Sequence, residues 1–195
     1  MTQDPTTPAG ETPPAPGLVA RRAVDGTLLE WLAVPPRAAA LGLEPHPEGG
    51  WYRRTWTSPG SLSTEAGTRP AATLIHFLLP PGEASAWHRV ESDEIWLWHG
   101  PDPLVLELGG AGPAPVAPAG SDAEGGAISD PTVSRILLGS GFGAGFGVVS
   151  ASGGEVAQGL VPGGVWQRTL PSDGEALVSC VVSPGFSFDD FSLAD

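Results

Sequence analysis

Residues 85–100, SAWHRVESDEIWLWHG, bring together side chains that could do acid–base chemistry. In a strand that begins near Glu94, successive side chains point to opposite faces, so Glu94, Trp96 and Trp98 share one face. If that face points into a closed sheet, the Glu94 carboxyl lies among indole rings and can act as an acid or base near neutral pH. In the alternative interpretation, the two tryptophans only fill the core and Glu94 pairs with an arginine.

His88 lies six residues before Glu94, across the turn RVESD. A strand, a turn and a second strand would bring the two side chains to neighbouring positions. A histidine and a glutamate that converge in this way can form an acid–base pair or part of a metal site. A single histidine on a strand is otherwise typical of a hydrogen-bonded structural residue.

Four further polar side chains could contact a ligand. The strand pattern of WYRRTWT puts Tyr52 and Arg54 on one face, where the phenol could bind a substrate and the guanidinium could hold a carboxylate or phosphate. A packing tyrosine and a surface arginine are the alternative. His76, in the apolar run TLIHFLL, is either a hydrogen-bonded core residue or a pocket residue. Gln167 follows the turn VPGG and can hydrogen-bond a ligand or coordinate a hard metal through its oxygen.

Three other residues of reactive types are interpreted as structural. His46 lies in a turn, PHPEGG, and His99 adjoins a Gly-Pro pair at a strand end, so both are interpreted as structural. Cys180 lies in the apolar strand LVSCVVS, which favours core packing. As the only cysteine, it cannot form an intramolecular disulfide.

The elements that must position these residues are mostly short strands. Two short helices are expected first, one after the cap Asp25 with Leu28, Leu29 and Leu32 on one face, and one from Pro36 to Leu41. The strand patterns then are WYRRTWT, ATLIHFLL, EIWLWHG, PLVLEL, VSRILLG, VAQGLVP, VWQRTL and ALVSCVVS. No long amphipathic helix interrupts them, which excludes a parallel βαβ architecture and favours an antiparallel sandwich or jelly-roll β-barrel.

Composition locates the flexible parts and limits the partners. A large share of the 28 glycines and 22 prolines lies in residues 1–17, predicted to be a disordered tail, and in residues 109–131, predicted to be a long mobile loop within one domain over 18–195. The others mark turns between strands. A net charge of −13 argues against binding to nucleic acid or to an anionic membrane surface. The sequence has neither a membrane-spanning apolar run nor a signal-peptide pattern, so a cytoplasmic protein is expected.

Several motifs together resemble a known family. LGLEPHPEGGWYRRTW, TLIHFLL, SAWHRVESDEIWLWHG, LVPGGVWQR and CVVSPGFSFDDF, in this order between Leu41 and Phe191, are similar to the DUF985 (Cupin_5) branch of the cupin superfamily. The resemblance implies an all-β, antiparallel jelly-roll barrel, usually a homodimer, with a small-molecule pocket inside the barrel.

Cupins in general hold a divalent metal with three histidines and a glutamate, and this sequence departs from that pattern. Glu94 matches the glutamate and His88 the first histidine, but the second histidine position holds Val90 and the third holds Gln167. His88, Glu94 and Gln167 are the only remnants of the ligand set. No cofactor is therefore expected, although a divalent metal stays open.

The residues and the resemblance together predict a small-molecule enzyme of the isomerase, epimerase or lyase type. His88 would be the general base and Glu94 an orienting carboxylate or an acid. The expected ligand-binding residues are Tyr52, Arg54, His76, Trp96, Trp98, Trp166 and Gln167. The alternatives are a non-enzymatic cupin that binds a small ligand on its aromatic side chains, and a divergent metal-dependent enzyme.

Overall fold

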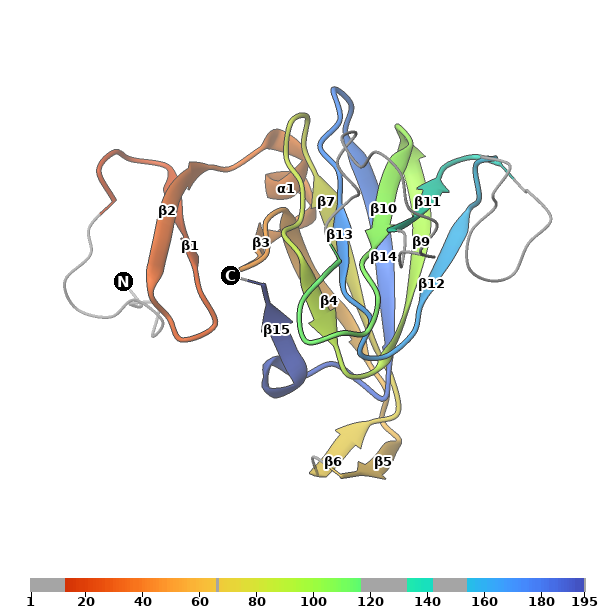
Figure 1. Cartoon of the computed structure of the whole chain (residues 1–195). Helices are drawn as coiled ribbons and strands as arrows, with labels where there is room; N and C mark the ends of the chain where they lie inside the picture. Colours follow the sequence, from red (N-terminus) through yellow and green to blue (C-terminus); the bar gives the residue numbers. More distant parts are fainter. Residues whose placement is uncertain (1–12, 66, 117–132, 142–153, 195) are drawn as a thin grey trace.

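Two antiparallel sheets enclose the interior of the computed structural model, which describes residues 13–65, 67–116, 133–141 and 154–194 (Figure 1). The six-stranded sheet has the order β12 (Gln158–Val161), β9 (Asp93–Pro101), β14 (Ala176–Ser183), β7 (Thr73–Leu79), β4 (Trp51–Thr57), β3 (Glu44–Pro45). The five-stranded sheet has the order β11 (Ser134–Leu138), β10 (Leu104–Leu108), β13 (Gln167–Thr169), β8 (His88–Val90), β15 (Phe191–Leu193). A short 3₁₀ helix, η1 (Phe188–Asp190), precedes β15, and a separate hairpin joins β5 (Ser61–Thr64) to β6 (Gly67–Pro70).

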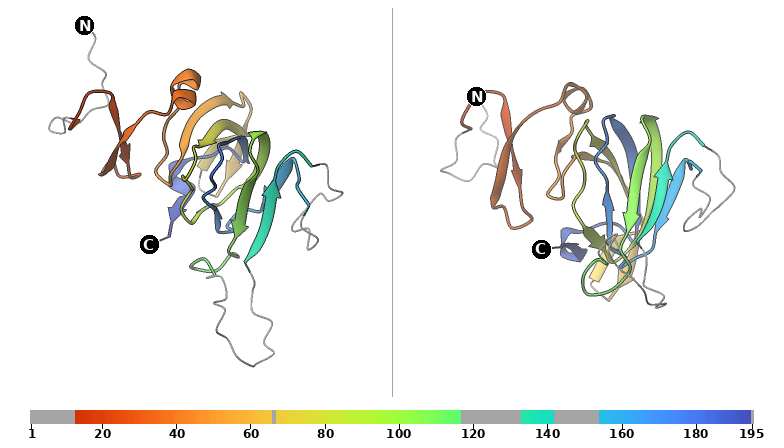
Figure 2. Two further views of the ribbon diagram at one scale, coloured as in Figure 1. Left: turned by 90° about the horizontal axis from the view of Figure 1, so that it is seen from above. Right: turned by 45° about the horizontal axis from the view of Figure 1, so that its top comes forward.

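All eight predicted strands are confirmed, but the prediction of a closed barrel is wrong. Figure 2 shows the two sheets curving around a common interior without joining into one sheet. At one side, β11 meets the segment before β12 through a single bridge, Leu138 to Val156. At the other side, the edge strands β3 and β15 have only two and three residues, too few for a hydrogen-bonded ladder that closes the sheet.

The first predicted helix is also wrong, whereas the second is confirmed as α1 (Pro36–Leu41). Residues Leu28–Ala33 form β2, which pairs along its length with β1 (Leu18–Arg22). The leucine spacing alone does not distinguish a helix from a strand. The strand forms because β1 is available as its pairing partner, which the helical interpretation did not take into account. Arg21 of β1 also donates to the Glu30 carboxylate of β2 at 2.6 Å.

Two apolar clusters lie on the two faces of the six-stranded sheet. The larger one fills the space between the sheets with side chains of β7, β9, β10, β11 and β14. The smaller one lies on the outer face, where Ala38 of α1 and Leu43 pack against Trp51 and Leu78. Trp51 thus points outward, and the alternation of β4 turns Tyr52 inward.

Gly50 permits the tight approach of the turn before β4 to the neighbouring strand. Its φ is +67°, and a Cβ there would lie 2.7 Å from Phe77 Cζ and 3.0 Å from the Leu78 carbonyl oxygen. Gly26 has a similar φ of +87°, with nothing within 4 Å of its Cβ position. We expect Gly50→Ala to lower the free energy of unfolding by about 3 kcal/mol and Gly26→Ala by about 1 kcal/mol, as measured by urea denaturation. Equal losses would contradict the role of steric contact at Gly50.

The flexible segments predicted from composition fall largely outside the described residues, which include only 13–17 of the predicted tail and 109–116 of the predicted loop. Residues 13–17 are exposed. Within the described ranges, no helix has the length and apolar character needed to cross a membrane.

Candidate functional site

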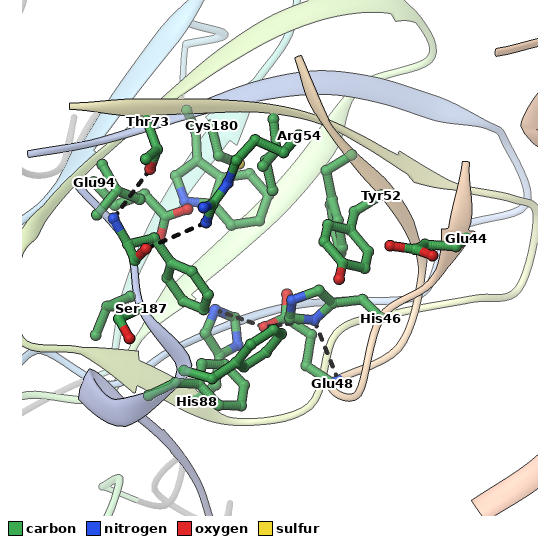
Figure 3. Close-up of a pocket in the computed structure, with 18 residues that line it drawn as sticks. Glu44, His46, Glu48, Tyr52, Arg54, Thr73, His88, Glu94, Cys180 and Ser187 are labelled. Carbon is green, nitrogen blue, oxygen red and sulfur yellow. Dashed lines mark hydrogen bonds and ion pairs between the residues drawn. The ribbon is translucent and has the colours of Figure 1, made fainter. Parts of the chain in front are cut away.

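A cavity of about 430 Å³ lies between the sheets and holds most of the buried ionisable side chains of the described chain (Figure 3). Its floor and walls come from the turn before β4, the inner face of the six-stranded sheet, β8 and the segment from Phe186 to Phe191. Its polar lining residues are Glu44, His46, Glu48, Tyr52, Arg54, Thr73, His88, Glu94, Cys180 and Ser187. Its apolar lining residues are Ile75, Phe77, Val90, Trp96, Val182, Phe186, Phe188 and Phe191.

Strand alternation explains which side chains of β4 and β9 reach the cavity. On β4, Tyr52 and Arg54 point inward, while Arg53 pairs with His76 on the outer face. On β9, Glu94 and Trp96 point inward while Ile95 is exposed. The alternation predicted from the sequence therefore holds for both strands.

Glu48 lies between two imidazoles at the bottom of the cavity. Its Oε2 is 3.4 Å from His88 Nε2 and 3.4 Å from His46 Nδ1. His88 Nδ1 lies 2.9 Å from the Ala86 carbonyl, which can only accept, so Nδ1 carries the proton and the Nε2 lone pair faces Glu48. The Glu48 backbone N–H donates to His46 Nδ1 at 3.4 Å, so the proton of neutral His46 is on Nε2.

Burial disfavours the charged form of each of these three groups. Desolvation lowers the pKa of His46 to about 3, with smaller contributions from His88 and Arg21. Desolvation lowers the pKa of His88 to about 4, against the hydrogen bond to Ala86. The pKa of Glu48 is raised well above its ordinary value by desolvation and by the nearby Glu94. Burial therefore favours the protonated form of Glu48, opposite a neutral His88.

Glu94 is held by a short chain of hydrogen bonds behind the cavity wall. Trp96 Nε1 donates to Gln167 Oε1 at 3.0 Å, and Gln167 Nε2 donates to Glu94 Oε2 at 2.6 Å. Because indole N–H can only donate, Trp96 fixes the orientation of the Gln167 amide. Desolvation raises the pKa of Glu94 to about 7, although hydrogen bonds from Gln167 and Cys180 lower it. The protonated and ionised forms of Glu94 are thus both populated near neutral pH, which is the property that acid–base chemistry requires.

Of three further polar lining residues, Tyr52 and Arg54 lie nearer to solvent, whereas Cys180 is buried. Desolvation and a hydrogen bond to the Glu44 carboxylate raise the pKa of Tyr52 to about 12, so the phenol keeps its proton. Arg54 is exposed and donates through Nη2 to the Phe186 carbonyl at 3.2 Å. Cys180 is buried, and desolvation raises the pKa of its thiol well above the ordinary value, so it is not a nucleophilic thiolate.

Five of the predicted site residues line the cavity together, namely Tyr52, Arg54, His88, Glu94 and Trp96. Gln167 lies directly behind them, fully buried, and contacts the cavity through Glu94. The other three predicted ligand contacts lie elsewhere. These are His76, Trp98 and Trp166.

Each of the three is displaced for a simple geometric reason. His76 is on the outer face of β7, where its Nδ1 lies 3.2 Å from Ser179 Oγ, because Phe77 takes the inward position. Trp98 follows Trp96 along β9 beyond the cavity, and its indole donates to the Asp102 carbonyl at 2.8 Å. Trp166 precedes β13, donates to the Gly112 carbonyl at 2.9 Å and packs under the Arg89 guanidinium.

Sequence reasoning missed two groups of cavity residues. His46 and Glu48 were interpreted as parts of a turn, although PHPEGG contains an acid and an imidazole two residues apart, the one signal that could have found them. Phe186, Phe188 and Phe191 lie in the C-terminal motif SPGFSFDDF, which was used only for the resemblance. Stacking of His88 against Phe191, with ring centroids 5.8 Å apart, links this motif to the floor of the cavity.

The side chains present do not fit the divalent metal of many cupins. In the described part of the chain, no group of three or more His, Cys, Asp or Glu side chains is arranged to hold a metal ion. Gln167, in the position of a cupin histidine ligand, accepts at its oxygen from Trp96 and turns its amide nitrogen to Glu94. It therefore does not offer its oxygen to a cation beside Glu94.

Comparisons with known proteins agree with the fold. A family model described as "Cupin superfamily (DUF985)" matches residues 37–194. A hypothetical protein from Leishmania major is 32% identical, with 80% of this chain and 83% of that chain covered and a TM-score of 0.59. Protein SO0799 from Shewanella oneidensis is also 32% identical, with 80% and 81% covered and the same TM-score. A comparison with curated proteins gave no match.

Proposed function

The chain belongs to the DUF985 family of the cupin superfamily, and on this basis we propose that it catalyses proton transfer at a carbon atom of a small molecule, as an isomerase or epimerase does. The proposal rests on a contrast between one buried glutamate that is paired with arginines and two that are not. Glu107 is fully buried and pairs with two arginines, Arg135 and Arg168, each at 2.7 Å. Glu48 and Glu94 are also buried, but among the described residues no arginine lies within 4.0 Å of either.

This contrast separates a structural carboxylate from two that suit chemistry. The two arginines hold the pKa of Glu107 below its ordinary value despite desolvation, as expected of a structural ion pair. Burial without an ion pair raises the pKa of Glu48 and Glu94 instead. Two such groups in one aromatic cavity are typical of acid–base catalysis near neutral pH.

In the proposed reaction, Glu94 moves the proton. Its carboxylate takes a proton from the carbon next to a carbonyl, the electron pair of that C–H bond forms a carbon–carbon double bond, and the π electron pair of the carbonyl moves to its oxygen. The protonated Glu48 donates a hydrogen bond to this oxygen and stabilises the enolate. In a substrate with a hydroxyl group on the first carbon, Glu48 gives its proton to the enolate oxygen and takes the proton of that hydroxyl group, whose carbon becomes the new carbonyl. Glu94 returns its proton to the former carbonyl carbon, which completes an isomerisation without a change of oxidation state overall.

His88 has a different role in this proposal from the general base expected from sequence. A pKa of about 4 makes its imidazole a weak base at neutral pH. Its Nε2 lone pair, 3.4 Å from Glu48 Oε2, instead faces the single O–H of Glu48 before the substrate binds, and that O–H turns to the enolate oxygen during the reaction. We therefore assign His88 as a positioning residue.

The test is incorporation of deuterium from solvent. The purified protein is incubated in D₂O with separate small aldoses, ketoses and oxo acids, and loss of each carbon-bound proton is followed by NMR. We expect at least one substrate class to exchange at a rate that saturates with its concentration. No saturable exchange with any of these classes, together with saturable binding of one of them, would favour the alternative of a binding protein without catalysis.

His88→Ala is expected to slow this exchange by about 10²-fold, because Glu48 then loses the group that orients it. His76→Ala is the matched control, since His76 lies on the outer face of the sheet and is expected to leave the rate unchanged. The upper and lower limbs of the pH–rate profile report whether Glu94 still titrates in His88→Ala. A rate equal to that of the unaltered protein would remove His88 from the site.

The metal-dependent alternative is tested by elemental analysis of the purified protein. Stoichiometric iron, manganese, nickel or zinc, with exchange lost on chelation and restored by that metal, would replace the proposed reaction. The homodimer and the cytoplasmic location stay predictions of the sequence.

A further inference from the structure

Arg54 brings a positive charge to a cavity whose deeper groups are acids and neutral imidazoles. It lies two residues after Tyr52 on β4 and lines the cavity, as Figure 3 shows. Its guanidinium is held over the Phe186 ring, 5.9 Å from the centroid, and donates through Nη2 to the Phe186 carbonyl at 3.2 Å. Within the described ranges, the other N–H groups of the fork have no hydrogen-bond partner, so they can bind an anion at the entrance.

The absence of a carboxylate beside Arg54 is unusual in so acidic a chain. The sequence has 22 acidic and nine basic residues, so most arginines have an acidic neighbour. In the described ranges, carboxylates lie within 4.0 Å of Arg21, Arg37, Arg69, Arg89, Arg135 and Arg168. None lies that close to Arg54, which lines the cavity, or to Arg53, which faces away from it.

We infer that the cavity takes a small monocarboxylate, whose carboxylate pairs with Arg54 and whose apolar or unsaturated body extends inward between the aromatic walls. The inference rests on the proposed function, because the same body must present its reacting carbon to Glu94 and Glu48. A planar guanidinium matches a carboxylate with two parallel hydrogen bonds. Phe77, Trp96, Phe186, Phe188 and Phe191 supply apolar faces for the body.

The charge balance favours a monoanion over a dianion. His46 and His88 are neutral because burial lowers their pKa values, so Arg54 is the one cationic side chain among the lining residues. A phosphate dianion would leave one negative charge uncompensated beside Glu44 and Glu94. The single charge of a carboxylate is matched by Arg54, so such a ligand adds no uncompensated charge of its own.

The test compares three probes with one aromatic body: phenylacetate, 2-phenylethanol and phenyl phosphate. Binding is measured by calorimetry and by saturation-transfer NMR, without turnover. We expect phenylacetate to bind saturably and at least tenfold more tightly than either of the other two. Tighter binding of phenyl phosphate, equal binding of the alcohol, or no saturable binding of phenylacetate would each overturn the inference.

Two variants test whether Arg54 causes the preference for the carboxylate. Arg54→Gln is expected to abolish the tenfold preference for phenylacetate over 2-phenylethanol, while Arg53→Gln, on the same strand but facing away, retains it. A preference that survives in Arg54→Gln would overturn the inference. Saturable binding of phenylacetate by the unaltered protein, without solvent exchange on any substrate class, would contradict only the proposed reaction. Solvent exchange on neutral sugars, without tighter binding of phenylacetate than of 2-phenylethanol, would contradict only the inference that the ligand is a carboxylate.

Discussion

Replacing Glu94 with glutamine is expected to slow solvent exchange by about 10²- to 10⁴-fold, the usual contribution of a general acid–base group. Glutamine keeps the shape of the side chain and can accept the hydrogen bond from Gln167, but it cannot take a proton. The rate is measured by NMR in D₂O on the substrate class that the unaltered protein exchanges. A variant that retained more than a tenth of the rate would exclude Glu94 as the base.

The same residue should set the pH dependence of the rate. Because the carboxylate form of Glu94 is the base and its pKa is about 7, exchange should rise as pH rises through about 7. At higher pH, ionisation of Glu48 removes the hydrogen-bond donor and the rate should fall. The rising limb near pH 7 should be absent from any residual exchange by Glu94→Gln.

Glu94→Gln should also be more stable than the unaltered protein in alkaline solution. The pKa of Glu94 is raised on folding, from 4.5 to about 7, so the unfolded chain loses this proton first as pH rises. The free energy of unfolding therefore falls between about pH 4.5 and pH 7, by on the order of 3 kcal/mol, and this loss is absent from the variant. Urea denaturation at pH 4 and pH 8 measures the difference. The same difference between variant and parent at both pH values would contradict a raised pKa.

Gln167→Leu is expected to have the second large effect, on both stability and the pH profile. It leaves the Trp96 indole N–H and one Glu94 oxygen buried without their partner, at a cost of about 1–3 kcal/mol for each group. Because Gln167 lowers the pKa of Glu94, its loss should also move the rising limb of the exchange profile to higher pH.

Denaturation curves and pH–rate profiles together check this prediction. Gln158→Leu serves as the control, since Gln158 is exposed on β12 and should leave both measurements unchanged. If Gln167→Leu matched the parent protein in stability and in the pH at which the exchange rate rises, Gln167 would have no part in holding Glu94.

Period-two alternation made the strands predictable, because it depends only on neighbouring residues. It also placed Tyr52, Arg54, Glu94 and Trp96 on inward faces. It did not reveal how far along a strand the cavity extends, so Trp98 was included although it lies beyond. The sequence TLIHFLL likewise did not show which side chains of β7 point inward, because both faces of this strand are apolar and His76 could point either way.

The parts that could not be predicted depend on contacts between distant segments. The partner of residues 28–33 is β1, and without it the leucine pattern fits a helix equally well. His46 and Glu48 lie in a turn whose direction is set by packing against β7 and the segment before β8. Sheet closure depends on the lengths of edge strands, which alternation does not determine.

The aromatic wall from Phe186 to Phe191 makes the cavity a product of almost the whole chain. Its lining starts at Glu44 and ends at Phe191, and β15 reaches its place only by pairing with β8, about a hundred residues earlier in the chain. The cavity thus forms only when the last strand has docked. A ligand that fills it binds the native state alone, so occupancy and global folding are thermodynamically linked, and the cavity reports the integrity of the entire domain.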